Sequence, residues 1–262
     1  YRFEAGLAAA QAGDAEGARQ MLASIDPSQL DAIAHSRYNL AQREIQQEAA
    51  HLGPDIEFHY RTVKAAPSNY VSHHDYVLAD LGMLEAGLSA QDDGYDAVCI
   101  DTMSDSGVNA LRSVLDIPVI APAKASYLMS LLLATRFGVL TQWDRWNIIY
   151  RKTLQEYGLA DKCVGIRSPG LAPDPVNLLG GKEDVVFPQF LKCGQELVDL
   201  GADEICLGST TMHEAHDFLS QELPVPIINP GPSPTNSPKR CSAWASATAA
   251  RPTRRRATSN SI

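Results

Sequence analysis

The chain has 262 residues, of which 45% are hydrophobic and 20% charged, and its formal net charge at pH 7 is −9. This mixture is typical of a globular protein of one large or two small domains, and it excludes collagen-like and low-complexity chains. The sequence has no apolar run near the roughly 18 residues of a membrane helix, and its acidic balance argues against a nucleic-acid surface on most of the molecule.

The N-terminal region, residues 1–35, has the pattern of a segment separate from the main body. Residues 5–25 have the pattern of a helical hairpin, interrupted at Gly13 and Asp14, and a single such repeat cannot stack a core of its own. We therefore expect residues 1–35 to form a helical appendage. A body at 36–233 follows, and it begins with a helix at 41–51 and a strand at 55–63.

The rest of the body alternates between helical and strand periodicity. Helices are predicted at 76–88, 107–115, 127–134, 144–157, 187–200 and 212–219, and strands at 97–100, 118–122, 137–141, 163–166, 204–207 and 226–229. Strands separated by helices imply right-handed crossovers and a mostly parallel sheet that is covered on both faces. The predicted fold class is α/β.

The last segment, 234–262, has a different character from the body. It carries six basic residues and no acidic one, with a run at Arg254, Arg255 and Arg256. Its few large apolar side chains cannot offset the entropy of ordering it. We expect a basic disordered tail, which a shifted reading frame would also produce; the alternative is an arm that binds nucleic acid or an anionic surface.

An internal repeat is the most informative feature of the sequence. The stretch GYDAVCIDT, which begins at Gly94, stands 107 positions before GADEICLGS, which begins at Gly201. LDIPVIAP, from Leu115, is echoed 108 positions later by LPVPIINP, from Leu223. The pattern indicates that one strand-turn-helix-strand unit is used twice, which predicts two pseudo-symmetric halves.

The turn after the first strand of each unit is rich in hydroxyl groups. In open α/β sheets ligands bind beyond the carboxyl ends of the strands, where a helix N-terminus also favours an anion. The sequence therefore predicts that two turns grip a small carboxylate, with these binding residues: Thr102, Ser104, Asp105 and Ser106 on one side and Ser209, Thr210 and Thr211 on the other. The alternative is that these residues are ordinary N-caps, Asp105 or Ser106 for one helix and Ser209 or Thr210 for the other.

These two units, together with RFGVLT at 136–141, resemble the aspartate/glutamate/hydantoin racemase superfamily over roughly residues 55–232. The resemblance implies a racemase-like fold in which a cysteine from each half moves the α-proton on opposite faces of a carboxylate- or imide-bearing substrate. It implies no metal or organic cofactor and an assembly into dimers or higher oligomers. The family's two cysteines fall at Thr102 and Ser209 of this chain, and a family glutamate falls at Lys124.

The two replacements change the chemistry that is expected. A thiolate near a helix N-terminus can act as a base near neutral pH, whereas a hydroxyl needs a neighbouring general base. Asp105 with Thr102 or Ser104 could supply base and donor, and Thr141 and Lys124 end further strands on the same side, where Lys124 could neutralise a carboxylate. We expect the side chains of Cys99 and Cys206 to be buried and to have a packing role only.

The sequence therefore predicts a cofactor-independent enzyme that acts on a small carboxylate, an amino acid or a hydantoin-like cyclic amide. It is a racemase or isomerase by resemblance, and a hydrolase or lyase is the alternative because the cysteines are absent. A catalytically inactive homologue that binds a small acid, or a damaged product, remains open. The five cysteines are unclustered, which favours a reducing cytoplasm over a disulfide framework; neither a metal site nor a membrane or nucleic-acid partner is expected for the body.

Overall fold

A computed structural model describes residues 61, 63–67, 69–172, 183–210 and 212–231. The expected appendage at 1–35, the helix at 41–51, nearly all of the strand at 55–63, Thr211 and the tail at 234–262 lie outside the described residues. None of the helices in the described part of the chain has the length and apolar character of a membrane crossing.

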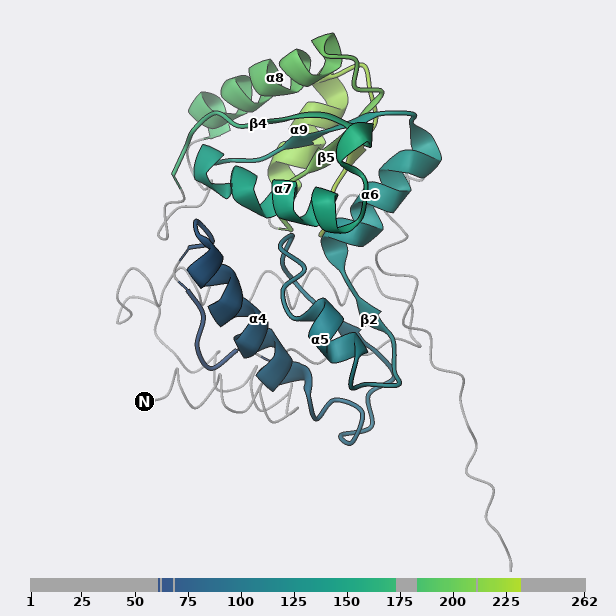
Figure 1. The fold of residues 1–262 in the computed structure, drawn as a ribbon. Helices are drawn as coiled ribbons and strands as arrows, with labels where there is room; N and C mark the ends of the chain where they lie inside the picture. The colour runs from purple at the N-terminus through teal and green to yellow at the C-terminus, as the bar shows by residue number, and fades with distance from the viewer. Residues whose placement is uncertain (1–60, 62, 68, 173–182, 211, 232–262) are drawn as a thin grey trace, which may run out of the picture.

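The described residues form two α/β units, one above the other in Figure 1. The lower unit contains helix α4 (His73–Gly87), strand β1 (Val98–Cys99), helix α5 (Val108–Arg112) and strand β2 (Val119–Ile120). Strands β1 and β2 pair in parallel. Ile100, Val108, Leu111 and Val119 form the core between this small sheet and its helices. The mixed α/β character and parallel pairing confirm the predicted fold class.

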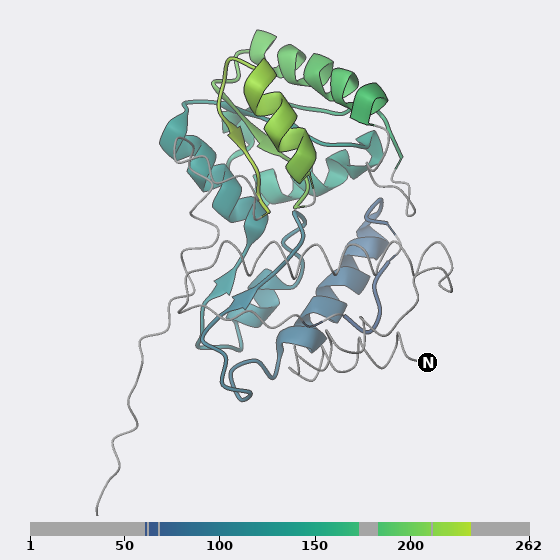
Figure 2. The same cartoon turned by 180° about the vertical axis from the view of Figure 1, so that it is seen from behind.

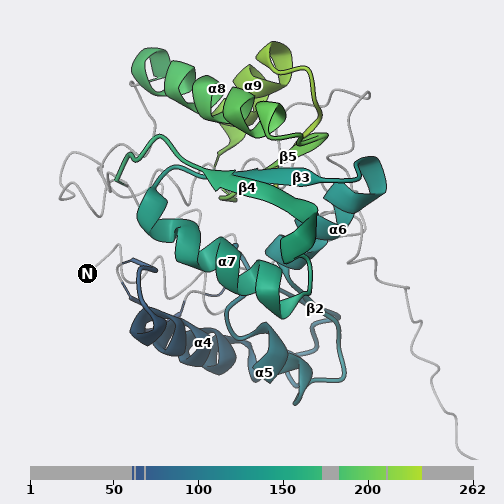
Figure 3. The same cartoon turned by 45° about the horizontal axis from the view of Figure 1, so that its top comes forward.

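The upper unit is built on a four-stranded parallel sheet in the order β4-β3-β5-β6. Its elements are α6 (Pro122–Leu133), β3 (Phe137–Leu140), the 3₁₀-helix η2 (Asp144–Trp146), α7 (Asn147–Glu156), the 3₁₀-helix η3 (Ala160–Lys162), β4 (Cys163–Arg167), α8 (Glu183–Asp199), β5 (Glu204–Leu207), α9 (His213–Glu222) and β6 (Ile227–Ile228). Helices α8 and α9 lie on one face of the sheet and α6 and α7 on the other (Figures 2 and 3).

The helices cover both faces of the sheet, and the central strands are buried throughout. All four residues of β3 and all four of β5 are buried, as expected for strands that are covered on both sides. One core, which includes Phe190 and Leu197, lies under α8 and α9. A second core, under α6 and α7, includes Phe137 and Tyr150.

The sequence repeat is also a repeat of strand pairing. Val98 pairs with Val119 and Cys99 with Ile120 in the lower unit. In the upper unit Ile205 pairs with Ile227 and Cys206 with Ile228. The offsets between equivalent partners are the 107 and 108 positions of the sequence repeat, so the two copies share both fold and register.

Some element boundaries differ from those predicted. Helix α6 begins at Pro122, whereas the sequence pattern predicted a strand up to that proline and a helix only from residue 127. A proline at the first helical position is favoured because its missing N–H has no helical partner there. Most of the other elements lie within about three residues of their predicted positions.

Gly107 closes the turn between β1 and α5 against α4. Its φ is +73°, and a Cβ atom there would lie 2.7 Å from the Cβ of Met83. Its N–H donates to Asp80 Oδ1 at 2.9 Å. Glycine is therefore required by both conformation and space.

We expect Gly107→Ala to lower the free energy of unfolding by about 2–3 kcal/mol, because it adds steric overlap to left-handed strain. Gly158→Ala is the matched control, since Gly158 has a φ of +67° and nothing within 4 Å of its Cβ position. That variant should lose only about 1 kcal/mol. Urea unfolding followed by circular dichroism measures both, and equal losses would contradict close packing of Gly107 against Met83.

Candidate active site

The turn after β1 contains a chain of linked hydroxyl groups. Ser104 and Ser106 are buried, and their Oγ atoms lie 2.8 Å apart. Thr102 Oγ1 lies 3.1 Å from Ser104 Oγ. The turn rises from the lower unit toward the upper unit (Figure 1). The three hydroxyl residues predicted on this side of the site are thus brought together by the structure.

The phenol of Tyr70 lies beside this hydroxyl chain. Burial raises the pKa of Tyr70, and hydrogen bonds with Ser104 and Thr102 partly oppose that rise. The ring of Tyr70 packs edge-on against Tyr76, with 6.4 Å between centroids. A phenol with a raised pKa is a hydrogen-bond donor at neutral pH. Tyr70 was not among the predicted site residues, because no spacing in the sequence links it to the turn more than 30 residues later.

Asp105 has a role that the sequence did not indicate. Its Oδ1 accepts the backbone N–H of Ala123 at 2.9 Å, and its Oδ2 accepts the N–H of Lys124 at 3.0 Å and the Tyr157 hydroxyl at 2.6 Å. Ala121, the N-cap residue of α6, has no side chain that could cap the helix. Asp105 therefore caps α6 from a turn that precedes it in the chain.

The surroundings of Asp105 act on its ionisation in opposite directions. Burial raises its pKa above the usual range, while the bonds from Tyr157 and the two N–H groups of α6 favour the carboxylate. The backbone of Asp105 has a φ of +48°, in the left-handed region that aspartate tolerates better than most residues. Both oxygens are engaged in holding α6 and Tyr157, so the carboxylate is fixed in one orientation.

Tyr150 holds the second turn, residues 208–210, by a hydrogen bond from its hydroxyl group. The Tyr150 hydroxyl donates to the carbonyl oxygen of Gly208 at 2.5 Å and lies 2.7 Å from Thr141 Oγ1. A Cβ atom at Gly208 would lie 2.5 Å from that hydroxyl, so only glycine fits there. Thr141 is fully buried, while Ser209 and Thr210, which follow Gly208, are half-buried.

Helix α7 connects the two turns. Tyr150, near its start, bonds to Gly208, and Tyr157, at its C-cap, bonds to Asp105. Residues seven apart lie on the same face of a helix, about 10 Å apart along its axis. Met103 of the first turn also packs in the same core as Tyr150 and Cys206. The two turns are thus attached along one face of α7.

The capping interpretation is wrong for the hydroxyl groups of the turn after β1. Helix α5 has Gly107 as N-cap, and no side chain caps it. Helix α9 has Met212 as N-cap, again without a side-chain cap. The hydroxyl groups of the first turn are therefore not explained by capping of α5, and the Asp105 carboxylate caps α6 rather than the helix that follows it.

Three other candidates have defined places. Lys124 is half-buried, and its Nζ lies 5.2 Å from the ring centroid of Tyr157, next to the Asp105 carboxylate. Cys206 is fully buried, and burial raises the pKa of its thiol, as expected for a packing residue. Cys99 is exposed, which corrects the expectation that it is buried. The described residues contain no group of three or more potential metal ligands.

Comparison with known proteins gives a consistent result. Residues 40–233 match the family model described as Asp/Glu/Hydantoin racemase. A hydantoin racemase of Pseudomonas sp. (strain NS671) is 30% identical over 169 residues, which is 63% of this chain and 66% of the relative. The chain thus spans just under two thirds of the length of this curated relative.

Solved structures show the same similarity in three dimensions. Allantoin racemase from Klebsiella pneumoniae superposes with a TM-score of 0.63 at 28% identity, covering 73% of this chain and 77% of that one. Glutamate racemase RacE1 from Bacillus anthracis has a TM-score of 0.54 at 17% identity, with 74% of each chain covered. The second similarity is one of fold.

Proposed function

Since this chain belongs to the Asp/Glu/hydantoin racemase family, we propose that it is a cofactor-independent isomerase that acts on a small carboxylate or a cyclic amide of the hydantoin type. The substrate would lie between the turn 102–106 and the turn 208–210. The observation that carries this proposal is the hydroxyl chain of Thr102, Ser104 and Ser106, whose members bond to one another beside Tyr70 instead of capping α5.

The hydroxyl groups of the site determine which chemistry it can perform. A hydroxyl or a phenol at neutral pH donates a hydrogen bond and is a poor proton acceptor. The hydroxyl groups of Tyr70 and Thr102 would therefore bind a carboxylate or carbonyl oxygen of the substrate. They would stabilise the negative charge that develops when the neighbouring α-proton leaves. Ser209 and Thr210 would act on the opposite face of the substrate. The same donors would suit a hydrolase or lyase that acts on this class of substrate.

A second candidate function is binding without turnover. It is favoured by the state of Asp105, the carboxylate proposed as the base, whose two oxygens accept three hydrogen bonds. A carboxylate whose oxygens already accept three hydrogen bonds is held by the protein rather than aimed at the proton that a general base must take. In that case the chain would bind a small acid through the same hydroxyl groups.

Solvent deuterium exchange at the α-carbon tests the proposal directly. We expect exchange or turnover with at least one substrate from a panel of hydantoins, allantoin, chiral amino acids, diacids and cyclic imides, followed by NMR and chiral chromatography. Thr102→Ala and Ser209→Ala should each lower the rate about 100-fold or more, the usual effect of removing one donor to a developing oxyanion. Ser113→Ala is the control and should leave the rate unchanged, since the exposed Ser113 hydroxyl donates to the carbonyl oxygen of Ala110 at the end of α5.

The outcomes separate the two functions. Turnover that survives both substitutions would place the active site elsewhere. Retained binding of a carboxylate without turnover of any substrate would favour the binding function. The double variant Thr102→Cys with Ser209→Cys should gain α-proton exchange if the two turns face one substrate, because thiolates supply the missing bases.

A further inference from the structure

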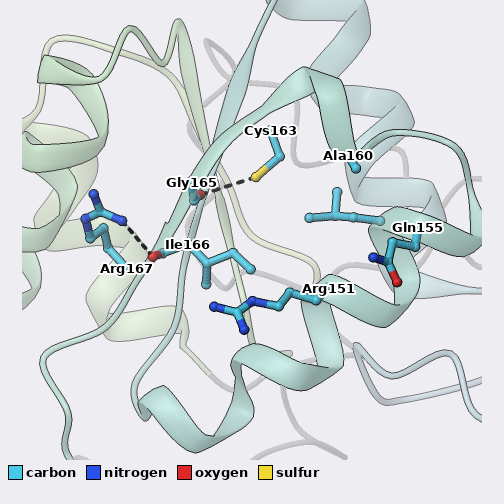
Figure 4. Close-up of a pocket in the computed structure, with 8 residues that line it drawn as sticks. Arg151, Gln155, Ala160, Cys163, Gly165, Ile166 and Arg167 are labelled. Atoms are coloured by element: carbon cyan, nitrogen blue, oxygen red, sulfur yellow. Dashed lines mark hydrogen bonds between the residues drawn. The ribbon is translucent and has the colours of Figure 1, made fainter.

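A pocket lies on a side of α7 away from the two turns. Helix α7, η3 and the edge strand β4 line an open pocket of about 350 Å³. Arg151 and Gln155 line it from α7, Ala160 from η3, and Cys163, Ile166 and Arg167 from β4 (Figure 4). Its volume lies within the range of pockets that bind small molecules.

The charge of the pocket is positive. Two guanidinium groups line it, and no carboxylate does. Arg167 is partly neutralised, because its Nε lies 3.2 Å from Glu196 Oε2. Arg151 is exposed, and no ion pair or hydrogen bond engages its guanidinium in the part of the chain that the structure describes. Figure 4 shows Arg151 extending from α7 beneath Ile166.

The other polar atoms of the pocket favour an anion over a cation. The carbonyl oxygen of Gly165 accepts from Cys163 Sγ at 3.2 Å, and that of Ile166 accepts from Arg167 at 3.0 Å. These two acceptors on β4 are therefore already occupied, while guanidinium donors remain. Burial raises the pKa of the Cys163 thiol, so it adds no negative charge at neutral pH. Leu154, Ala160 and Ile166 supply an apolar wall.

We propose that this pocket binds a small organic anion, namely a carboxylate on a compact apolar body. Arg151 would pair with the carboxylate, and the apolar wall would cover the body of the ligand. The site is separate from the proposed active site, because Arg151 and Gln155 lie about 100° or more around α7 from Tyr150. An occupant would nevertheless contact the helix that holds both turns.

A titration of the isotope-labelled full chain with benzoate, followed by NMR of the backbone amides, tests the proposal. We expect shifts at the amides of Ala160 and Gly165 and a dissociation constant at least tenfold lower for benzoate than for benzamide, its neutral analogue. Arg151→Gln should weaken benzoate binding about tenfold or more, the effect of losing a charge-assisted hydrogen bond. Ala160→Trp should abolish it by filling the cavity.

Arg145→Gln is the matched control. Arg145 stacks on Trp143 at 5.2 Å outside the pocket, so this variant changes the net charge equally and should bind benzoate as the original chain does. Equal affinity for benzoate and benzamide, or unchanged binding by Arg151→Gln, would overturn the proposal. Shifts confined to residues 102–106 and 208–210 would also overturn it, while they would support the proposed active site.

Discussion

Replacing Asp105 with alanine is expected to lower the free energy of unfolding by about 4 kcal/mol, a large effect for one substitution. The change removes the N-cap of α6, worth about 1–2 kcal/mol. It also leaves the N–H of Ala123 and the hydroxyl of Tyr157 without their partner, at about 1–3 kcal/mol for each donor that stays buried. Urea unfolding of the two proteins measures the difference.

Asp101→Ala is the matched control, because Asp101 is an exposed carboxylate in the same turn and should change stability by less than about 0.5 kcal/mol. Asp105→Asn distinguishes a cap from a catalytic base. The asparagine amide keeps one acceptor oxygen, but its NH₂ group faces one of the α6 N–H donors and cannot bond to it. We therefore expect an intermediate loss of about 2 kcal/mol in the free energy of unfolding. Full stability of Asp105→Asn together with complete loss of turnover would show that Asp105 acts as a base instead.

The stability of the protein should fall as the pH rises toward 8, because of Glu204. This residue is fully buried at the start of β5; its Oε1 accepts the N–H of Ile228 at 3.1 Å, and its Oε2 has no hydrogen-bond partner among the described residues. Burial raises the pKa of Glu204 from 4.5 to about 8. Between these values the folded chain holds a proton that the unfolded chain releases, so folding takes up one proton.

Linkage then gives the size and sign of the effect. The contribution of Glu204 is fully present below its ordinary pKa and is lost by about 1.4 kcal/mol per pH unit until the pH reaches its folded pKa. From pH 5.5 to pH 7.5 we therefore expect a loss of about 3 kcal/mol. Urea unfolding at a series of pH values measures this slope, and Glu204→Gln should remove it.

The difference between the original chain and Glu204→Gln isolates this carboxyl from other titrating groups. Glu222→Gln, at the exposed end of α9, is the control and should leave the slope unchanged. A slope that persists in Glu204→Gln would mean that another group carries the pH dependence. If the original chain instead lost stability relative to Glu204→Gln as the pH fell, the pKa of Glu204 would be lowered on folding.

The sequence predicted the fold well because its main signals are local or repeated. Strand β5 was predicted at its observed bounds, since a short run that ends in three apolar residues stands between Gly-Ala-Asp and Gly-Ser and leaves little freedom. The repeat predicted the equivalence of β1 with β5, and the shared register confirms it. The start of α6 was missed because a proline ends most strands as readily as it begins helices.

The candidate site was predictable only in part. The ends of the repeated strands located Thr102, Ser104 and Ser106, which the structure links by hydrogen bonds. The family resemblance placed the expected cysteines at Thr102 and Ser209. The functional roles of these residues remain predictions, because they depend on a substrate.

By itself, the amino-acid sequence determined the α/β class, the doubled unit and the hydroxyl-rich turns, since periodicity and strand-end position are properties of neighbouring residues. Only the tertiary structure decided that Tyr70 lies beside the hydroxyl chain, that Asp105 caps α6, and that Tyr150 and Tyr157 attach both turns to α7. These contacts join residues 18 to 58 positions apart, and no local pattern specifies them. They depend on how the two units pack, which fixes the partners of each buried polar group.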